Sequence, residues 1–394
     1  MKILFVHEVS WFNKVVYEMH DFPELLSLKG HEVFFLDFEE GKPRTRWRTT
    51  TTAESRAHPG SRVLVTSPPR FLPGILGRLL AVVIQPLAFL FLCRRIRPDL
   101  VVLYSVPTSG WQIVAMCRRM GLPVISRVID VPHVLRKTRF VRLVKSAERY
   151  VFSRADFVAT HNEVLREYCI DHGAMRSRTA VILPGCDSKR FVPAPPNREL
   201  QQQLGIHPNQ KVLVFMGTLF RFGGVHELVS ELSVPLRQDS NLMFLVLGNG
   251  EDSLRVASLV EQLELSRQVL LSGRIEYDML ADYLRLGHVA LLPFLPNLVT
   301  HCALPGKILQ YLACGLPTIA TPLRGLQSVV QEGDGVLYAN SPSEMARLAV
   351  NLANDSTERV KLATRGVELM NQKCNWDRQI EQFEQLLRSV SRGT

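Results

Sequence analysis

The chain has 394 residues and a formal net charge of +10, with 46% hydrophobic and 21% charged residues. This size and composition exclude a largely disordered chain and a small disulfide-stapled domain, and they indicate two or three domains with hydrophobic cores. The seven cysteines form no Cys-x-x-Cys pair and no cysteine–histidine spacing typical of zinc, so we expect free thiols in a reducing compartment.

The first predicted strand, residues 2–6, contains an apolar run of only four residues, 3–6, which His7 and Glu8 follow at once. This run is too short for a signal-peptide core and predicts a buried strand, so we expect a cytoplasmic protein. Strand-like and helical segments then alternate, which is typical of a parallel sheet covered by helices on both faces. Residues 42–62 are polar and rich in Thr and Arg, and we predict a surface loop there. Predicted strands are residues 31–36, 100–104, 123–130 and 157–159, and predicted helices are residues 15–29, 111–120 and 140–153.

The segment at residues 71–93 is nearly all apolar and is flanked by arginines at residues 70 and 94–97. Its longest run without a charge, residues 79–93, is shorter than the roughly 20 residues that a spanning helix needs, so the pattern disfavours a transmembrane helix. Two alternatives stay open. One is a helix buried against the sheet, and the other is a helix that lies in a lipid interface with its arginines at the headgroups.

A proline-rich segment at residues 192–197 predicts a stiff linker between domains. After it the alternation of strands and helices starts again. We therefore predict an α/β protein of two doubly wound, Rossmann-like parallel-sheet domains, residues 1–193 and 194–372, that face each other across a ligand-binding cleft. The predicted strands of the second domain are residues 211–216, 243–247, 269–271, 289–292, 318–320 and 335–338.

The positive charge is concentrated in the first half of the chain. Residues 1–190 contain 29 Lys and Arg against 17 Asp and Glu, a net charge of +12, whereas residues 191–394 contain 18 against 20, a net charge of −2. A basic half indicates an anionic partner. The sequence contains no helix-turn-helix, zinc-finger or RNA-binding motif, so we expect no nucleic acid and favour an anionic membrane surface, contacted by the first domain and residues 71–97.

The strongest functional signal lies in residues 304–317. Pro305 and Gly306 open a predicted helix, the next turns are apolar, and Gly315 ends it. The unpaired N–H groups and the positive dipole end at such a helix start favour a phosphate, and Lys307 adds a full positive charge. The alternative is an ordinary buried helix with a solvated lysine.

Two glycine-containing loops, residues 215–225 and 247–251, directly follow predicted buried strands. Glycines there permit a close approach of the backbone to a ligand, and Arg221 offers a two-pronged guanidinium to a phosphate. Glycine after a strand is also ordinary turn chemistry. However, several such loops in one domain, all at the carboxyl ends of strands, indicate a common site.

Several segments, in this order, carry a resemblance to a known family. In the second half they are residues 212–219, 248–251, 269–274, 290–294 and 307–321, and in the first half, more loosely, residues 30–33, 98–101, 155–158 and 184–187. Residues 197–372 resemble the donor-binding domain of the retaining GT-B glycosyltransferases of group 1, the large family that contains sucrose synthases and bacterial mannosyltransferases. The resemblance implies a nucleotide-diphosphate sugar as substrate and a C-terminal helix, residues 373–394, that crosses back onto the first domain.

The same resemblance assigns the donor site. The family usually carries two glutamates eight positions apart, where this chain has Cys302 and Gln310, but some relatives replace them with Pro-x-Lys, as in residues 305–307. A lysine of the family is likewise replaced by Gly223. The sequence has no Asp-x-Asp triplet, so we expect neither a metal nor another cofactor. The predicted donor-binding residues are Gly217, Thr218, Asn249, Gly250, Arg274, Pro305, Gly306, Ile308 and Gln310, with Arg221 and Lys307 as the cations that stabilise the leaving diphosphate.

For the acceptor side we predict Asp130 and His133, because the family often carries an Asp or a His after this strand. A lone histidine is otherwise more often a structural residue. The resemblance implies transfer on one face of the sugar, with retention, in which an oxygen of the diphosphate helps to deprotonate the acceptor. No protein nucleophile is therefore expected.

Three hypotheses remain open at this point. The first is a retaining glycosyltransferase of polysaccharide or glycolipid assembly, cytoplasmic or peripheral at the inner membrane face, whose acceptor is a glycan or a lipid-linked sugar. The second is a nucleotide-sugar epimerase, which needs carboxylates for proton transfer and no lipid-facing surface, so the basic apolar segment argues against it. The third is a non-catalytic partner subunit whose donor site has lost the family's glutamates.

Overall fold

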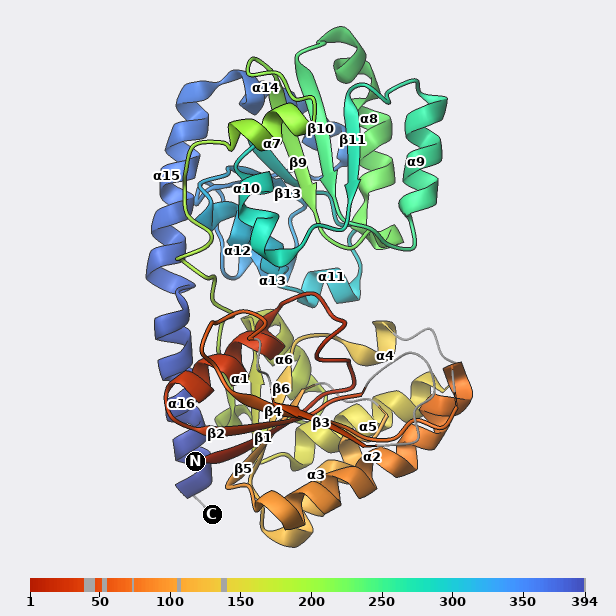
Figure 1. The fold of residues 1–394 in the computed structure, drawn as a ribbon, viewed down its shortest axis with the longest axis vertical. Helices are drawn as coiled ribbons and strands as arrows, with labels where there is room; N and C mark the ends of the chain where they lie inside the picture. Colours follow the sequence, from red (N-terminus) through yellow and green to blue (C-terminus); the bar gives the residue numbers. More distant parts are fainter. Residues whose placement is uncertain (39–46, 52–54, 73, 105–107, 136–139, 393–394) are drawn as a thin grey trace. The chain divides into compact units, whose positions relative to one another are not determined.

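The computed structural model describes residues 1–38, 47–51, 55–72, 74–104, 108–135 and 140–392, and it divides into two compact units (Figure 1). The first unit comprises Met1–Pro184 and Asp377–Thr394, and the second comprises Gly185–Trp376. The proline-rich segment at residues 192–197 therefore lies inside the second unit. The residues before it belong there because the Cys186 N–H donates a hydrogen bond of 2.8 Å to the Cys374 carbonyl, and Gly185 packs against the Trp376 ring.

The first unit contains an eight-stranded sheet in the order β3-β4-β2-β1-β5-β6-β7-β8. All neighbouring strands are parallel except β3 and β4, which are antiparallel. The central strand β5 is buried along its whole length and its neighbour β1 from Ile3 to Val6, which explains their continuous apolar runs. The strands are β1 (Lys2–Val6), β2 (Glu32–Leu36), β3 (Arg48–Thr51), β4 (Val63–Ser67), β5 (Leu100–Tyr104), β6 (Val124–Val128), β7 (Phe157–Thr160) and β8 (Thr179–Val181).

Helices cover both faces of this sheet (Figure 1). The helices α2, α3 and α5 pack one against the next, and α1 contacts β2 and β4. The helix α3 ends at Gly121 in the left-handed conformation, as the sequence indicates. The helices are α1 (Glu18–Leu28), α2 (Gly74–Ile96), α3 (Gly110–Met120), α4 (Pro132–Leu135), α5 (Val141–Arg154), α6 (Glu163–Asp171) and the C-terminal α16 (Trp376–Arg392).

The predicted loop at residues 42–62 is wrong over residues 48–51, whereas residues 55–62 contain only bends and turns, as a loop does. Residues 48–51 form β3, an edge strand paired with β4, because Thr is β-branched and fits the pleated surface of a sheet. Residues 56–58 are held to α1, where their three backbone N–H groups donate hydrogen bonds of 2.6–2.9 Å to the Glu24 carboxylate. Residues 39–46 and 52–54 lie outside the described residues.

The second unit contains a six-stranded, all-parallel sheet in the order β11-β10-β9-β12-β13-β14. Two parallel-sheet α/β domains are thus confirmed. The strands are β9 (Lys211–Met216), β10 (Leu242–Leu247), β11 (Val269–Gly273), β12 (Val289–Leu292), β13 (Thr318–Ala320) and β14 (Val336–Tyr338). The helices are α7 (Arg198–Gln203), α8 (Val225–Gln238), α9 (Ser253–Gln262), α10 (Leu280–Leu284), α11 (Leu298–Cys302), α12 (Gly306–Ala313), α13 (Arg324–Gln327), α14 (Pro342–Asn354) and α15 (Ser356–Lys373).

The C-terminal helix α16 packs on the first unit, as predicted. Its Glu384 carboxylate accepts hydrogen bonds of 3.1 Å from the Lys29 ammonium and the His31 imidazole, and its Phe383 ring lies 4.5 Å from the Phe22 ring. Phe383 and Phe22 are fully buried. This apolar contact, with the ion pair at its edge, anchors the end of the chain to the first sheet.

Candidate functional site

The helix α12 begins at Gly306, where the sequence predicts it. Its N-cap residue Pro305 makes no side-chain capping hydrogen bond, and a Cβ atom built on Gly306 would meet no atom within 4 Å. The first residue of the helix therefore has open space at its Cβ position among the described residues. Unsatisfied N–H groups and the positive end of the helix dipole make such an open start suitable for an anion.

Lys307, in the first turn of α12, extends back to the end of β9. Its ammonium lies 4.6 Å from the centre of the Phe215 ring and 4.8 Å from that of Phe294, and a Cβ atom at Gly217 would overlap its Nζ atom. Within the described part of the chain, no carboxylate lies within ion-pair distance of this ammonium. Burial lowers the pKa of Lys307 from its ordinary value to about 7. Among the described residues, the two ring faces are the groups that stabilise the ammonium. A bound anion would stabilise this charge further.

The loops after β9, β10 and β11 pack on one another through their backbones. Gly217 and Gly248 have φ values of +139° and +143°, and a Cβ atom at Gly248 would overlap the Gly217 carbonyl. The Gly248 N–H donates to the Gly273 carbonyl at 2.8 Å, and the Leu219 N–H donates to the Asn249 carbonyl at 3.2 Å. Glycine is required at 217 and 248 because both the backbone conformation and the close contact exclude a side chain.

The other predicted donor-binding residues fall into three groups by exposure. The side chains of Thr218, Arg221, Asn249 and Arg274 are exposed, and Gly250, Pro305 and Gln310 are half-buried. The Ile308 side chain is fully buried in the core, and its N–H donates to the Pro305 carbonyl at 3.0 Å, so this residue serves the packing of α12. The structure thus brings Lys307 and Gly217 into contact, with Asn249 and Gly250 in the adjoining loop.

In the first unit, Asp130 follows β6 and lies near Tyr17 and Glu18. Burial, and secondarily the Glu18 carboxylate, raise the pKa of Asp130 to about 6. The Tyr17 hydroxyl is hydrogen-bonded to the His7 imidazole at 2.9 Å, just after β1. A titratable group in this pH range, near a phenol that is hydrogen-bonded to a histidine, is typical of a site that exchanges protons.

His133 belongs to a second cluster, built on α4, α5 and α6. Its Nδ1 atom and its backbone N–H both lie 2.8 Å from the Glu148 carboxylate, and the Tyr168 hydroxyl lies 3.2 Å from the same Nδ1. The Glu148 carboxylate therefore fixes the orientation of the His133 ring. Among the described residues, the structure shows no direct contact between Asp130 and His133.

Sequence reasoning missed several polar residues that complete these clusters. Glu8 follows β1 and accepts hydrogen bonds of 2.6–3.2 Å from the Thr108 N–H and hydroxyl and the Ser109 N–H. Glu148 is buried in a helix whose charged residues are otherwise basic. This isolated carboxylate could have indicated a functional residue from the sequence. Phe215 and Phe294 follow the core pattern of their segments, so nothing in the sequence separated them from packing residues. No group of three His, Cys, Asp or Glu side chains suited to a metal ion occurs in the ranges that the structure describes.

Comparison with known proteins supports this architecture. The family model for a glycosyl transferase 4-like domain matches residues 23–185, and the model for glycosyl transferases group 1 matches residues 210–355. A D-inositol 3-phosphate glycosyltransferase from Kineococcus radiotolerans is 28% identical over 241 residues, which are 55% of this chain and 54% of that protein. The chain spans about half to three fifths of the length of the curated relatives that it matches first.

Solved structures share the fold over the whole chain. Sucrose-phosphate synthase from Thermosynechococcus elongatus has a TM-score of 0.82 at 17% identity, with 100% of both chains covered. The Anabaena protein HepE in complex with UDP has a TM-score of 0.75 at 16% identity, with 99% of this chain and 100% of that chain covered. The family models and the two-sheet architecture together show that the chain belongs to the group 1 glycosyltransferases, with the GT-B fold.

Proposed function

We propose that this protein is a retaining glycosyltransferase that moves a sugar from a nucleotide-diphosphate sugar to an acceptor at the cytoplasmic face of a membrane. The observation that carries the proposal is the ammonium of Lys307 beside the open start of α12. A leaving diphosphate gains negative charge as its bond to the sugar breaks, and a fixed cation with free N–H groups stabilises that charge. The UDP bound by the similar Anabaena structure supports a nucleotide-sugar donor.

Different side chains bind the donor and the acceptor in this reaction. Lys307 and the α12 start hold the diphosphate, with the exposed guanidinium of Arg221 as a second cation, so no metal or other cofactor is needed. The glycine loops after β9 and β10 allow the donor to approach the backbone closely. On the acceptor side, Asp130 and His133 orient the sugar hydroxyls, and Glu148 fixes the His133 ring. The proton of the acceptor leaves with the diphosphate oxygen, and the anomeric configuration is retained.

The acceptor is a lipid-linked sugar or a growing polysaccharide. Such acceptors are held at a membrane, and the excess of 29 Lys and Arg over 17 Asp and Glu in residues 1–190 favours an anionic membrane surface. The protein is accordingly proposed to be cytoplasmic and peripheral at the inner face. A nucleotide-sugar epimerase has no need of such a surface.

One observation favours a second candidate, a non-catalytic relative. Cys302 stands where the family usually has a glutamate, and its side chain is buried with a raised pKa, so it is a neutral thiol. Lys307 lies at the proposed diphosphate site, and no carboxylate of the described residues lies within ion-pair distance of its ammonium. A protein that binds a nucleotide diphosphate but transfers no sugar would fit this candidate.

Calorimetry and product analysis test both candidates. We expect UDP, GDP or ADP to bind the purified protein, and one corresponding sugar nucleotide to be hydrolysed slowly or transferred to a membrane-lipid extract. The product's anomeric proton, observed by NMR, should report the same configuration as the donor. Binding without turnover of any sugar nucleotide would favour the non-catalytic relative, and the absence of both would refute the donor site.

Replacing Gly217 with alanine should weaken binding of the nucleotide diphosphate at least tenfold. The new methyl group would overlap the Lys307 Nζ atom and displace the ammonium, in addition to straining a backbone with φ of +139°. The matched control is Gly205→Ala, because Gly205 also has a positive φ, +67°, but has open space around its Cβ position. Equal affinities of the two variants in calorimetry would contradict the contact between Gly217 and Lys307.

A further inference from the structure

The helix α2 is fixed to the first unit along one side. Ala81, Ala88 and Phe89 are buried against the fold. Midway along the helix, the buried Gln85 side chain accepts a hydrogen bond of 2.7 Å from the Ser109 hydroxyl. The Gln112 side chain of α3 donates to the Val82 carbonyl of α2 at 3.0 Å. The sequence left open whether this helix is buried against the sheet or lies in a lipid interface. These contacts show that one face of the helix is packed into the core of the first unit.

The opposite side of α2 is apolar and exposed. Its members recur every three or four residues, which places them within an arc of about 120° on a helix of 3.6 residues per turn. Each of these side chains is more than half exposed, and the Trp47 ring lies 5.5 Å from the last of them. We call this set the outer stripe: Leu76 (61% exposed), Leu79 (56%), Val83 (57%), Leu87 (58%) and Phe91 (51%).

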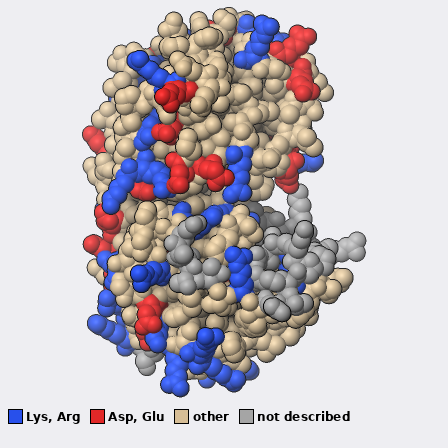
Figure 2. Space-filling view, in the orientation of Figure 1, with Lys and Arg blue, Asp and Glu red and all other residues tan. Residues whose placement is uncertain are grey.

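Positive charge predominates on α2 and on the helices that pack beside it. The helices α2, α3 and α5, which pack side by side, contain nine Arg and Lys residues and a single carboxylate, that of Glu148. Glu148 is buried against His133, so it presents no negative charge to solvent. Arg94 and Arg95, at the end of α2, are exposed. Figure 2 shows the gathering of Lys and Arg at the lower end of the first unit, with few Asp and Glu among them.

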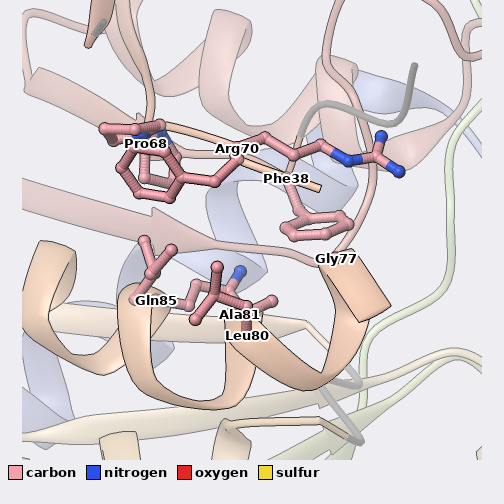
Figure 3. A pocket seen from close by; sticks show the side chains of 10 residues that line it. Phe38, Pro68, Arg70, Gly77, Leu80, Ala81 and Gln85 are labelled. Atoms are coloured by element: carbon pink, nitrogen blue, oxygen red, sulfur yellow. The ribbon is translucent and has the colours of Figure 1, made fainter. Parts of the chain in front are cut away.

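A narrow pocket lies beside the beginning of α2, next to the packed side of the helix. Phe38, Pro68 and Arg70 line one side of it, and α2 forms the other side (Figure 3). The neighbouring Phe71 and Leu72 are 48% and 42% exposed. An arginine thus accompanies apolar side chains at the start of the helix as well as at its end.

We infer that the outer stripe is a lipid-binding surface. Through this stripe, α2 lies on an anionic membrane with the helix axis parallel to the membrane plane. Aliphatic and aromatic side chains enter the boundary of the acyl chains, while arginines at both ends of the helix meet the phosphate groups. This deepens the proposed function by naming the surface that brings the first unit to a membrane-bound acceptor.

The same contacts argue against two other arrangements. In the described chain one helix segment, Leu79–Ile96, is long and apolar enough to cross a membrane, and 39% of it is buried in the fold. Insertion across a bilayer would require Gln85, Ala88 and Phe89 to leave the core, so α2 lies on the membrane without spanning it. A second copy of the chain would present the same positive charge and repel this face.

Vesicle sedimentation tests the inference without requiring catalysis. The protein should bind vesicles of phosphatidylcholine with phosphatidylglycerol at least tenfold more strongly than pure phosphatidylcholine vesicles, and added salt should release it. The triple variant Leu79→Gln, Val83→Gln, Leu87→Gln should lose at least tenfold in partitioning. The matched control replaces the exposed apolar residues of the second unit, Leu254, Val234 and Val360, which are 84%, 56% and 66% exposed, with glutamine and should bind like the parent.

Three results would overturn the inference. The first is that the parent protein does not bind anionic vesicles, and the second is that the triple variant binds them as strongly as the parent. The third is that the protein stays in the vesicles after an alkaline carbonate wash, which indicates a spanning helix. A parent dimer that becomes a monomer in the triple variant, with no vesicle binding, would assign the outer stripe to a second copy. Nucleotide binding by calorimetry, measured on the same variants, separates failure of this surface from failure of the donor site.

Discussion

Replacing Lys307 with methionine should lower kcat/KM for sugar transfer by about a hundredfold to a thousandfold, the usual cost of removing one group that stabilises charge in a transition state, or about 2.7–4 kcal/mol. Methionine is an unbranched side chain one atom shorter than lysine, so it retains most of the packing beside the Phe215 and Phe294 rings and removes the ammonium. Steady-state kinetics with the donor identified by the hydrolysis screen provides the measurement.

The pH dependence of binding gives this prediction a second readout. Since the pKa of Lys307 in the empty site is about 7, the ammonium is increasingly lost above pH 7, whereas a bound diphosphate stabilises it. Binding above pH 7 must then take up a proton, and the Kd for UDP should rise by up to about tenfold per pH unit between pH 7 and 9. In Lys307→Met this dependence should disappear. Calorimetry in buffers of different ionisation enthalpy measures the proton uptake directly.

A lysine on the surface of the same unit serves as the control. Lys361 is half-exposed and pairs with Glu358 at 2.9 Å on α15. Lys361→Met should leave both kcat/KM and the pH dependence unchanged. If Lys307→Met retained the parent's rate and its proton uptake, the diphosphate would be bound elsewhere, and the central observation behind the proposed function would be lost.

The strands of the second unit could be predicted from the sequence because burial on both faces makes them uninterrupted apolar runs. The ranges 211–216, 289–292 and 318–320 coincide with β9, β12 and β13. The start of α12 could also be predicted from the sequence, because Pro305 and Gly306 mark it. In contrast, β3 is polar and pairs only at an edge, so its Thr-rich segment gave the pattern of a loop.

The details of the candidate site depend on contacts between residues far apart in the chain. Lys307, on α12, contacts Gly217 at the end of β9. The Glu148 carboxylate, on α5, contacts His133 on α4. The exposed side of α2 could not be predicted from the sequence for the same reason. The sequence showed an apolar segment with arginines at its ends, but which side of the helix meets the sheet follows only from the position of the buried Gln85.

A buried ion pair provides the largest expected change in stability. The Arg127 guanidinium, on β6, is fully buried and donates two hydrogen bonds of 2.7 Å to the Glu18 carboxylate at the start of α1. It also donates to the Thr160 and Ile182 carbonyls at 2.8 Å. This single side chain thereby joins α1, β6, β7 and the segment after β8. The apolar neighbours of Arg127 predict only a buried strand.

Arg127→Met should destabilise the first unit by about 3–5 kcal/mol, because it leaves the Glu18 carboxylate buried near Asp130 without its counter-charge. Urea unfolding followed by hydrogen exchange in peptides from β1, β6 and β7 measures the loss separately from the second unit. Arg127→Met with Glu18→Gln should recover part of it, since the uncompensated charge is then removed. Arg176→Met, at the exposed pair with Glu167, is the control and should change nothing measurable. Equal stabilities of Arg127→Met and Arg176→Met would show that the buried pair does not hold these strands together.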